Sequence, residues 1–138
     1  MTIGNETMDM KERLFMEKLN GRCCSESIMS MFLEDAGRDN EDLVKAMGAT
    51  CVGMKEGLVC GTLVTAVSVL FVAAENRTQA RDELRPKMMK WFLDRYGSYS
   101  CEDILDGDET RTFTYCPSVV AETYCKLIEI LEDADLLK

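Results

Sequence analysis

An uncharged segment in the middle of the chain limits the folds that are open to it. Residues Leu58 to Ala74 carry no charged side chain, whereas the segments on both sides are rich in charge. The run falls just short of the ~20 apolar residues that span a membrane, and it contains Thr62, Thr65 and Ser68. We therefore expect a central helix that is buried on all sides and is not inserted into a membrane.

The remaining segments also favour helices. Apolar residues recur at helical spacing, the chain has only two prolines, and strand-like alternation between turn residues is absent. The first helix should present Leu14, Phe15, Lys18 and Leu19 as its packing face. The expected helices around the central one cover residues 8–19, 24–36, about 40–47, 77–96, a short segment from 101, and 117–131.

The length of the chain fits one domain with its own core. We expect residues 1–138 to form a single all-α domain, a bundle of about five to seven helices around the buried central helix. Pro86 falls inside the 77–96 segment, where it either kinks a long helix or starts a second one.

A glycine-rich loop leads into the central helix. Gly48, Gly53 and Gly57 fall within ten residues of one another, and Gly61 follows Cys60. Gly57, Gly61 and Thr65 recur every four residues, which makes a ridge of small side chains where another backbone can approach closely. We expect Gly57 and Gly61 to lie beside a bound cofactor.

The charge of the chain excludes several kinds of partner. The net charge is −9, and no basic stripe with interleaved aromatic residues occurs. These features argue against binding to nucleic acid or to an anionic membrane surface. The polar residues 1–13 do not resemble a secretion signal, so we expect a cytoplasmic protein with mostly reduced thiols.

Seven cysteines and no histidine restrict the chemistry further. A Cys–His nucleophile pair, a mixed Cys/His zinc site and a CxxCH haem attachment are all excluded. The odd cysteine count argues against a fully paired disulfide framework. Four cysteines lie near expected helix starts, where exposed N–H groups and the helix dipole favour a thiolate: Cys24, Cys60, Cys101 and Cys116. We expect Ser100 to cap the helix that begins at Cys101, and Cys116 to be the N-cap before Pro117.

The other three cysteines have weaker functional signals. Cys125 lies deep in the last expected helix and is typical of a small buried hydrophobic residue. Cys51, in the glycine loop, fits a structural and a functional role equally well. Cys23 adjoins Cys24, and one of these two is a bystander because a disulfide between neighbours would strain the peptide.

The four helix-start cysteines carry a family resemblance. Cys24-Ser25-Glu26-Ser27-Ile28 resembles the Cys-Ala-Gln-Ser-Val stretch of the family named for its C_GCAxxG_C_C signature. The segment Cys60–Ala66 is similar to the Cys-Gly-Ala-x-x-Gly-Ala core of that family, and Cys101 and Cys116 follow in the expected order. The resemblance runs from about Gly21 to Leu131.

The resemblance implies an all-helical domain with four functional cysteines, often encoded beside transporters or oxidoreductases. The protein would then be an accessory component of such a system. The family is also similar to the iron–sulfur part of split-Soret cytochromes, where cysteines hold a [2Fe–2S] cluster. Inside the core motif this chain departs from the family, with Thr62 in place of alanine and Thr65 in place of glycine.

Two kinds of redox chemistry remain open, each suited to electron transfer or redox sensing. In one, Cys24, Cys60, Cys101 and Cys116 are the metal ligands of a [2Fe–2S] or [4Fe–4S] cluster. In the other, the same four cysteines are catalytic thiols in dithiol–disulfide exchange, with Cys101 and Cys116 as the first pair to test. The sequence does not identify the redox partner protein, and a homodimer is one way to shield a cluster.

Two further functions compete with the redox hypotheses. A structural zinc site with four cysteine ligands is one, although its usual C-x₂₋₄-C ligand spacing does not occur here. A non-enzymatic helical interaction module is the other, because ten methionines and an acidic surface suit an adaptable binding protein. Metal analysis discriminates among iron with sulfide, zinc alone, and neither.

Overall fold

The computed structural model describes residues 3–108, 110–111 and 115–137, with side chains described from residue 10 onward. Every named element in this part of the chain is helical, which confirms the predicted all-α class. The α-helices are α1 (Ile3–Leu19), α2 (Cys24–Asp35), α3 (Glu41–Met47), α4 (Gly61–Ala73), α5 (Arg77–Gln79), α6 (Arg85–Tyr96), α7 (Cys101–Leu105) and α9 (Cys116–Asp133). Shorter turns are the 3₁₀ segment η1 (Gly48–Thr50) and the π-type segments η2 (Gly53–Gly57) and η3 (Ala80–Leu84).

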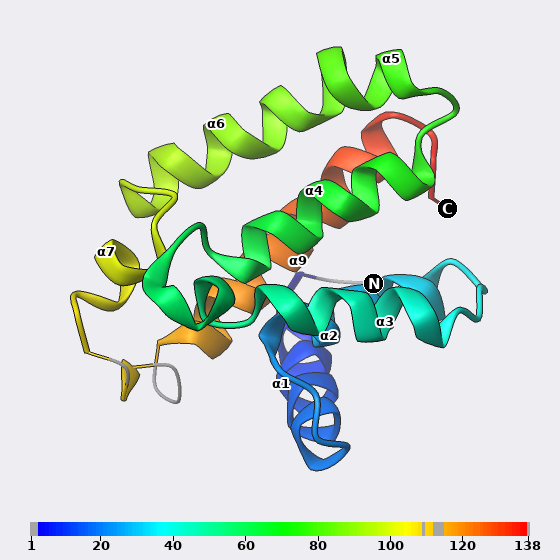
Figure 1. Ribbon diagram of the computed structural model, residues 1–138. Helices are drawn as coiled ribbons and strands as arrows, with labels where there is room; N and C mark the ends of the chain where they lie inside the picture. Colours follow the sequence, from blue (N-terminus) through cyan, green and yellow to red (C-terminus); the bar gives the residue numbers. More distant parts are fainter. Residues whose placement is uncertain (1–2, 109, 112–114, 138) are drawn as a thin grey trace.

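Helix α4 is the central element. It packs against α2, α6 and α9, and in Figure 1 it runs between the α5–α6 arm and the α2–α3 pair. The prediction of burial on all sides is wrong at two places. The helix begins at Gly61, so Leu58 and Val59 lie before it and are exposed, and Phe71 is 38% exposed. Among the described helices, none is long and apolar enough to cross a membrane.

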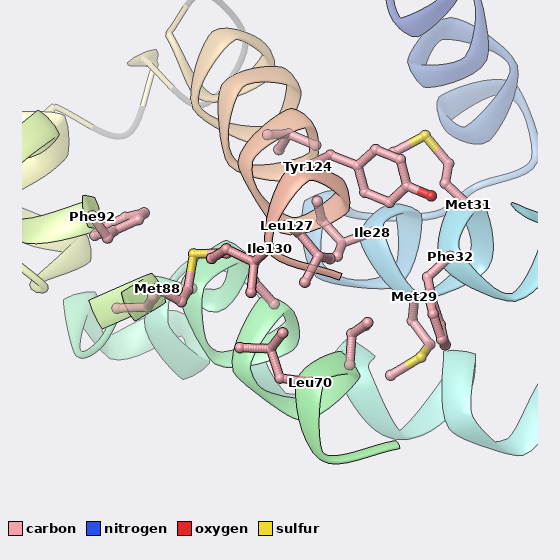
Figure 2. Close-up of a cluster of buried hydrophobic side chains, with 14 of the residues drawn as sticks. Ile28, Met29, Met31, Phe32, Leu70, Met88, Phe92, Tyr124, Leu127 and Ile130 are labelled. Carbon is pink, nitrogen blue, oxygen red and sulfur yellow. The ribbon is translucent and has the colours of Figure 1, made fainter. Parts of the chain in front are cut away.

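The core lies where α2, α4, α6 and α9 meet. Their inward faces interdigitate in Figure 2, and the fully buried side chains include Ile28, Met29, Met31, Phe32, Leu70, Met88, Phe92, Tyr124 and Leu127. Burying large side chains completely stabilises the fold by roughly 1.5–3 kcal/mol each. This shared core holds the ends of the four helices in fixed positions.

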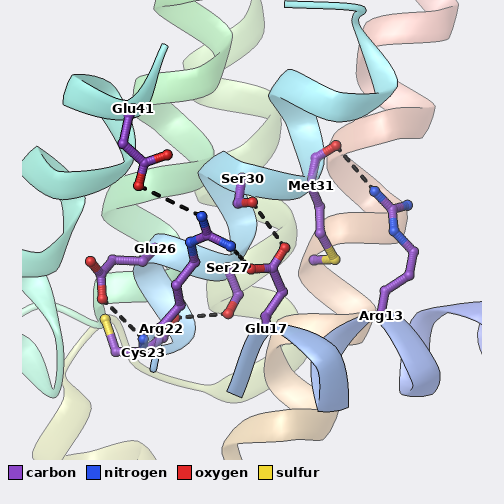
Figure 3. Close-up of polar contacts among 9 residues, drawn as sticks. All are labelled: Arg13, Glu17, Arg22, Cys23, Glu26, Ser27, Ser30, Met31 and Glu41. Atoms are coloured by element: carbon purple, nitrogen blue, oxygen red, sulfur yellow. Dashed lines mark hydrogen bonds and ion pairs between the residues drawn. The ribbon is translucent and has the colours of Figure 1, made fainter. Parts of the chain in front are cut away.

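Helix α1 packs through a different face from the one predicted. Leu14 is buried, but Phe15 and Leu19 are more than half exposed. The buried face instead includes Met10, Leu14 and Glu17, at helical spacing. The reason is that Glu17 accepts hydrogen bonds from Arg22 (2.8 Å) and from Ser30 Oγ (2.9 Å) of α2, so its carboxylate is satisfied against the bundle (Figure 3).

Local signals set most helix ends as predicted. Asn40 caps α3 by accepting a hydrogen bond from Leu43 N at 3.3 Å. Pro86 stands in the first turn of α6, and the helical backbone continues without a break from α5 through the π-type turn η3 into α6, so the proline is accommodated within one helical segment next to a wider turn. Gly97 ends α6 in the left-handed conformation with φ +78°. In α9, Ile130 is buried and Ile128 is half-buried.

Candidate functional site

All four predicted cysteines lie at helix N-termini. Cys24, Cys101 and Cys116 are the first residues of α2, α7 and α9, and Cys60 is the N-cap of α4. Two placements differ by a residue or more from expectation. Tyr115, not Cys116, occupies the N-cap of α9, and Cys60 precedes its helix instead of lying inside it. Exposed N–H groups at such positions stabilise negative charge on sulfur.

A short antiparallel bridge brings Cys60 and Cys101 together. Cys60 N donates to Tyr99 O at 2.8 Å, and Cys101 N donates to Leu58 O at 2.5 Å. These bonds flank an isolated bridge between Val59 and Ser100. Because side chains alternate along extended backbone, Cys60 and Cys101 project to the same face of this bridge.

The predicted cap of α7 is confirmed. Ser100 Oγ accepts a hydrogen bond from Asp103 N at 3.3 Å and donates one to Gly57 O at 3.2 Å. A Cβ on Gly57, whose φ is +68°, would lie 3.1 Å from Glu102 Cβ. The observed contacts of Gly57 are therefore packing contacts with the start of α7, and its contact with a cofactor stays a prediction.

Gly61 allows the starts of α2 and α4 to meet. A Cβ at this position would lie 2.3 Å from both Ser25 Oγ and Thr50 O, so no larger residue fits without movement. Ser25 is completely buried beside Cys24, and its hydroxyl has no hydrogen-bond partner among the described residues. The glycine thus places Cys24 and Cys60 on adjoining backbone, and its contact with a cofactor also stays a prediction.

The thiols of Cys24 and Cys116 are hydrogen-bonded to each other. This bond from Cys116 is the main cause that lowers the pKa of Cys24 to about 7, and the positive charge of Lys18 adds to it. The same bond, burial, and the nearby sulfurs of Cys24, Cys60 and Cys101 raise the pKa of Cys116 above its ordinary range. Four sulfurs therefore interact in one place, which we name the four-thiol site.

Cys60 is one of the two buried cysteines of the site, with Cys101. Its side chain is 7% exposed, and burial raises its pKa. The backbone N–H groups of Leu63 and Thr62, and the Thr62 hydroxyl, oppose that shift by hydrogen bonding to the sulfur. Thr62 stands where the family signature has alanine, so this chain adds a hydroxyl beside one of its four thiols. Thr65 is also fully buried, so the packing around α4 accommodates its larger side chain.

Cys23 and Cys51 form a disulfide with a Cα–Cα distance of 6.3 Å. The sequence analysis did not predict this pair, since it expected one of Cys23 and Cys24 to be a bystander and left the role of Cys51 open. No local pattern indicates the pairing, because α3 and η1 must first turn the chain back toward the start of α2. Cys125 is half-buried in α9.

A group of side chains that could hold a metal ion lies at this disulfide. Cys23, Glu26 and Cys51 each offer one ligand atom, and these atoms lie within 4.8 Å of one another. Within the described part of the chain this is the group that meets such spacing, and it includes none of the four-thiol residues. No three sulfurs of the four-thiol site lie that close together in the described structure.

Comparison with known proteins identifies one family. Residues 22–130 match the family described as putative redox-active protein (C_GCAxxG_C_C). The match covers most of the chain and spans all four cysteines of the four-thiol site. No curated protein and no solved structure matches the chain.

Proposed function

Because this chain belongs to the family described as putative redox-active protein (C_GCAxxG_C_C), we propose that its four-thiol site holds an iron–sulfur cluster that serves electron transfer or redox sensing. The observation that carries the proposal is the convergence of four cysteines from four helix N-termini: Cys24, Cys60, Cys101 and Cys116. A dithiol exchange needs two thiols, whereas a cluster is held by four.

The donor set fits such a cluster. Four thiolates are the ligands that [2Fe–2S] and [4Fe–4S] centres use. A single zinc ion would hold its sulfurs within about twice the Zn–S bond of ~2.3 Å. Because no three of the four sulfurs lie within 4.8 Å of one another among the described residues, their placement supports a centre with several metal atoms over the zinc alternative. When bound, the cluster would accept and release single electrons.

The chain's own residues would bind and shield that centre. The N–H groups at the starts of α2, α4, α7 and α9 offset the charge of the thiolates. Cys60 and Cys101 are almost fully buried, so they keep water from one side of the site. Hydrogen bonds from Thr62 and from backbone N–H groups to Cys60 sulfur tune the potential of a cluster.

The test is metal and acid-labile sulfide analysis of protein purified without oxygen, with a visible spectrum before and after dithionite. We expect iron and sulfide together, and a chromophore that dithionite bleaches. Cys60→Ser should lose both, whereas Cys125→Ser, a matched variant outside the four-thiol site, should keep both. Unchanged iron and sulfide in Cys60→Ser would show that the assignment is wrong.

The hydrogen bond between Cys24 and Cys116 supports a second candidate function, dithiol–disulfide exchange in the metal-free protein. The Cys24 thiolate would attack a substrate disulfide, forming a mixed disulfide and releasing one thiolate. Cys116, after losing its proton, would then attack the Cys24 sulfur, which forms a Cys24–Cys116 bond and releases the second thiolate. The pair differs from the Cys101–Cys116 pair that helix positions favoured.

Thiol counting distinguishes this candidate from the first. Metal-free, reduced protein treated with oxidised glutathione should form a Cys24–Cys116 disulfide, which peptide mass spectrometry identifies. Cys116→Ser should stop at the glutathione adduct on Cys24. An oxidised wild-type protein without the Cys24–Cys116 link would exclude this chemistry.

A further inference from the structure

A second sulfur site lies beside the four-thiol site without sharing a residue with it. Cys23 is the N-cap of α2, and Cys51 directly follows η1. Their sulfurs and a carboxylate oxygen of Glu26 lie within 4.8 Å of one another, and all three residues are half-buried. Figure 3 shows the Cys23 sulfur next to the Glu26 carboxylate. Partial exposure leaves these atoms within reach of an ion from solvent.

We propose that Cys23, Glu26 and Cys51 bind a zinc ion when the two cysteines are reduced, and release it when they are joined as a disulfide. Zinc takes sulfur ligands at ~2.3 Å and carboxylate oxygen at about 2.0–2.2 Å, so its ligand atoms lie within about 4.6 Å of one another. Cys23 and Cys51 have a Cα–Cα distance of 6.3 Å, and reduction frees their two bonded sulfurs to separate to that spacing beside Glu26. Three protein ligands leave the fourth tetrahedral position for water.

The position of Glu26 prepares it for this role. Its Oε1 accepts a hydrogen bond from Cys23 N at 3.1 Å, which fixes the side chain against the start of α2 (Figure 3). Its Oε2 faces Gly48, where a Cβ would lie 3.2 Å away. One oxygen is therefore engaged in capping, while the other borders a residue that has no side chain and is available to an ion.

The redox step balances with a common reductant. Two molecules of a small thiol reduce the Cys23–Cys51 bond, giving two protein thiols and one small-molecule disulfide. Zinc then displaces one proton from each cysteine and binds the two thiolates and the Glu26 carboxylate. A small disulfide oxidant reverses the sequence and frees the ion. The bonded and metal-bound states exclude each other because both use the same two sulfurs.

The proposed zinc site lies next to residues at the starts of α2 and α4. Cys23 is adjacent to Cys24, and the carbonyl of Thr50, just before Cys51, abuts Gly61 at the start of α4. The zinc proposal nevertheless stands apart from the cluster proposal, since it uses other residues. A variant that loses the four-thiol site should therefore keep the second site.

The test is zinc titration of the full chain, with Zn²⁺ alone as the probe and a chromophoric chelator as competitor. Reduced wild-type protein should bind one more zinc ion than reduced Cys51→Ser, and the difference should vanish after oxidation by a small disulfide. Cys60→Ser, which disrupts the four-thiol site, should still bind the zinc ion that Cys51→Ser loses. Equal zinc binding by reduced wild-type and Cys51→Ser would overturn the proposal.

A milder variant guards against loss of folding in Cys51→Ser. Glu26→Gln keeps both thiols and a side chain of the same size, and Gln Oε1 still accepts the bond from Cys23 N. Its affinity for the extra zinc should fall about tenfold or more, as expected when a ligand loses its charge. An unchanged affinity of Glu26→Gln for zinc would show that the Glu26 carboxylate is not a zinc ligand. Zinc should also slow formation of the Cys23–Cys51 bond in wild-type protein, as followed by peptide mass spectrometry.

Discussion

The thiol of Cys116, at the start of α9, is hydrogen-bonded to the sulfur of Cys24, at the start of α2. The two helices pack against each other, so the bond joins distant parts of the sequence. The bond makes the two thiols differ in acidity, because it lowers the pKa of Cys24 and raises that of Cys116. Cys24 becomes the more acidic thiol, and Cys116 becomes the proton donor that stabilises its thiolate.

This inequality predicts the pH dependence of alkylation in reduced, metal-free protein. The folded pKa of Cys24 is about 7, below the ordinary value of 9.0, so its thiolate is nearly complete at pH 9 and is lost as the pH falls through 7. The rate at which iodoacetamide modifies Cys24 should therefore reach half its maximum near pH 7. Peptide mass spectrometry at a series of pH values measures this rate.

Removing the Cys116 thiol, the hydrogen-bond donor, is the control for the pH dependence of Cys24 alkylation. In Cys116→Ala the thiolate of Cys24 loses its hydrogen bond, so the midpoint should move up toward the ordinary value of 9.0. Cys125→Ser should leave the midpoint near 7. A wild-type midpoint close to 9, or one that Cys116→Ala does not move, would contradict the role assigned to this bond.

Gly61→Ala should destabilise the fold by roughly 1–3 kcal/mol, the usual cost of forcing a methyl group into packed structure. The added Cβ would lie 2.3 Å from Ser25 Oγ and from Thr50 O, and the latter is backbone that cannot rotate away. Urea denaturation followed by circular dichroism measures the change. Gly48→Ala is the matched control, because its added Cβ would lie 3.2 Å from the nearest atom, Glu26 Oε2, and would meet no backbone, so its loss of stability should be smaller.

Helix ends were predictable from the sequence where the signal is local. Ser100 caps α7 and Asn40 caps α3, as their residue types favour. The Ser100 cap and Pro117 are the local signals for the helix-start positions of Cys101 and Cys116, so these two positions followed from short stretches of sequence.

Contacts between distant segments were not predictable in this way. The Cys23–Cys51 disulfide depends on the path of the chain through α3 and η1, which no nearby residue encodes. The predicted packing face of α1 was wrong for a similar reason. Its rotation depends on Glu17 meeting Arg22 and Ser30, and a periodicity argument counts a glutamate as solvent-facing.

Tyr124→Phe should lower the free energy of unfolding by about 1.5–3 kcal/mol, the range for a hydrogen bond to a charged group. The Tyr124 hydroxyl is buried and donates to Asp35 Oδ2 at 2.5 Å, and Arg13 binds the same carboxylate at 3.1 Å. The bond links α9 to the end of α2. Urea denaturation of the variant gives the change in stability.

Tyr96→Phe is the comparison for that measurement. The Tyr96 hydroxyl donates to Glu122 at 2.7 Å, but the side chains of Glu122 and its partner Arg95 are 40% and 50% exposed, and Tyr96 itself is only half-buried. Water can replace much of this hydrogen bond, so Tyr96→Phe should lower the free energy of unfolding by less than about 1 kcal/mol. Equal losses in the two variants would show that burial of the Tyr124 bond adds nothing.

Val52→Gly should stabilise the protein by about 1 kcal/mol. Val52 has φ +52° and ψ +45°, a left-handed conformation that a β-branched residue adopts only at a cost of about 1–2 kcal/mol, which exceeds the extra entropy glycine loses on folding. The control is Val59→Gly, because Val59 lies in the antiparallel bridge, where glycine weakens extended backbone. A higher urea midpoint for Val52→Gly and a lower one for Val59→Gly is the expected pair of results. A loss of stability in Val52→Gly would mean that the Val52 side chain contributes more through its contacts than its backbone conformation costs.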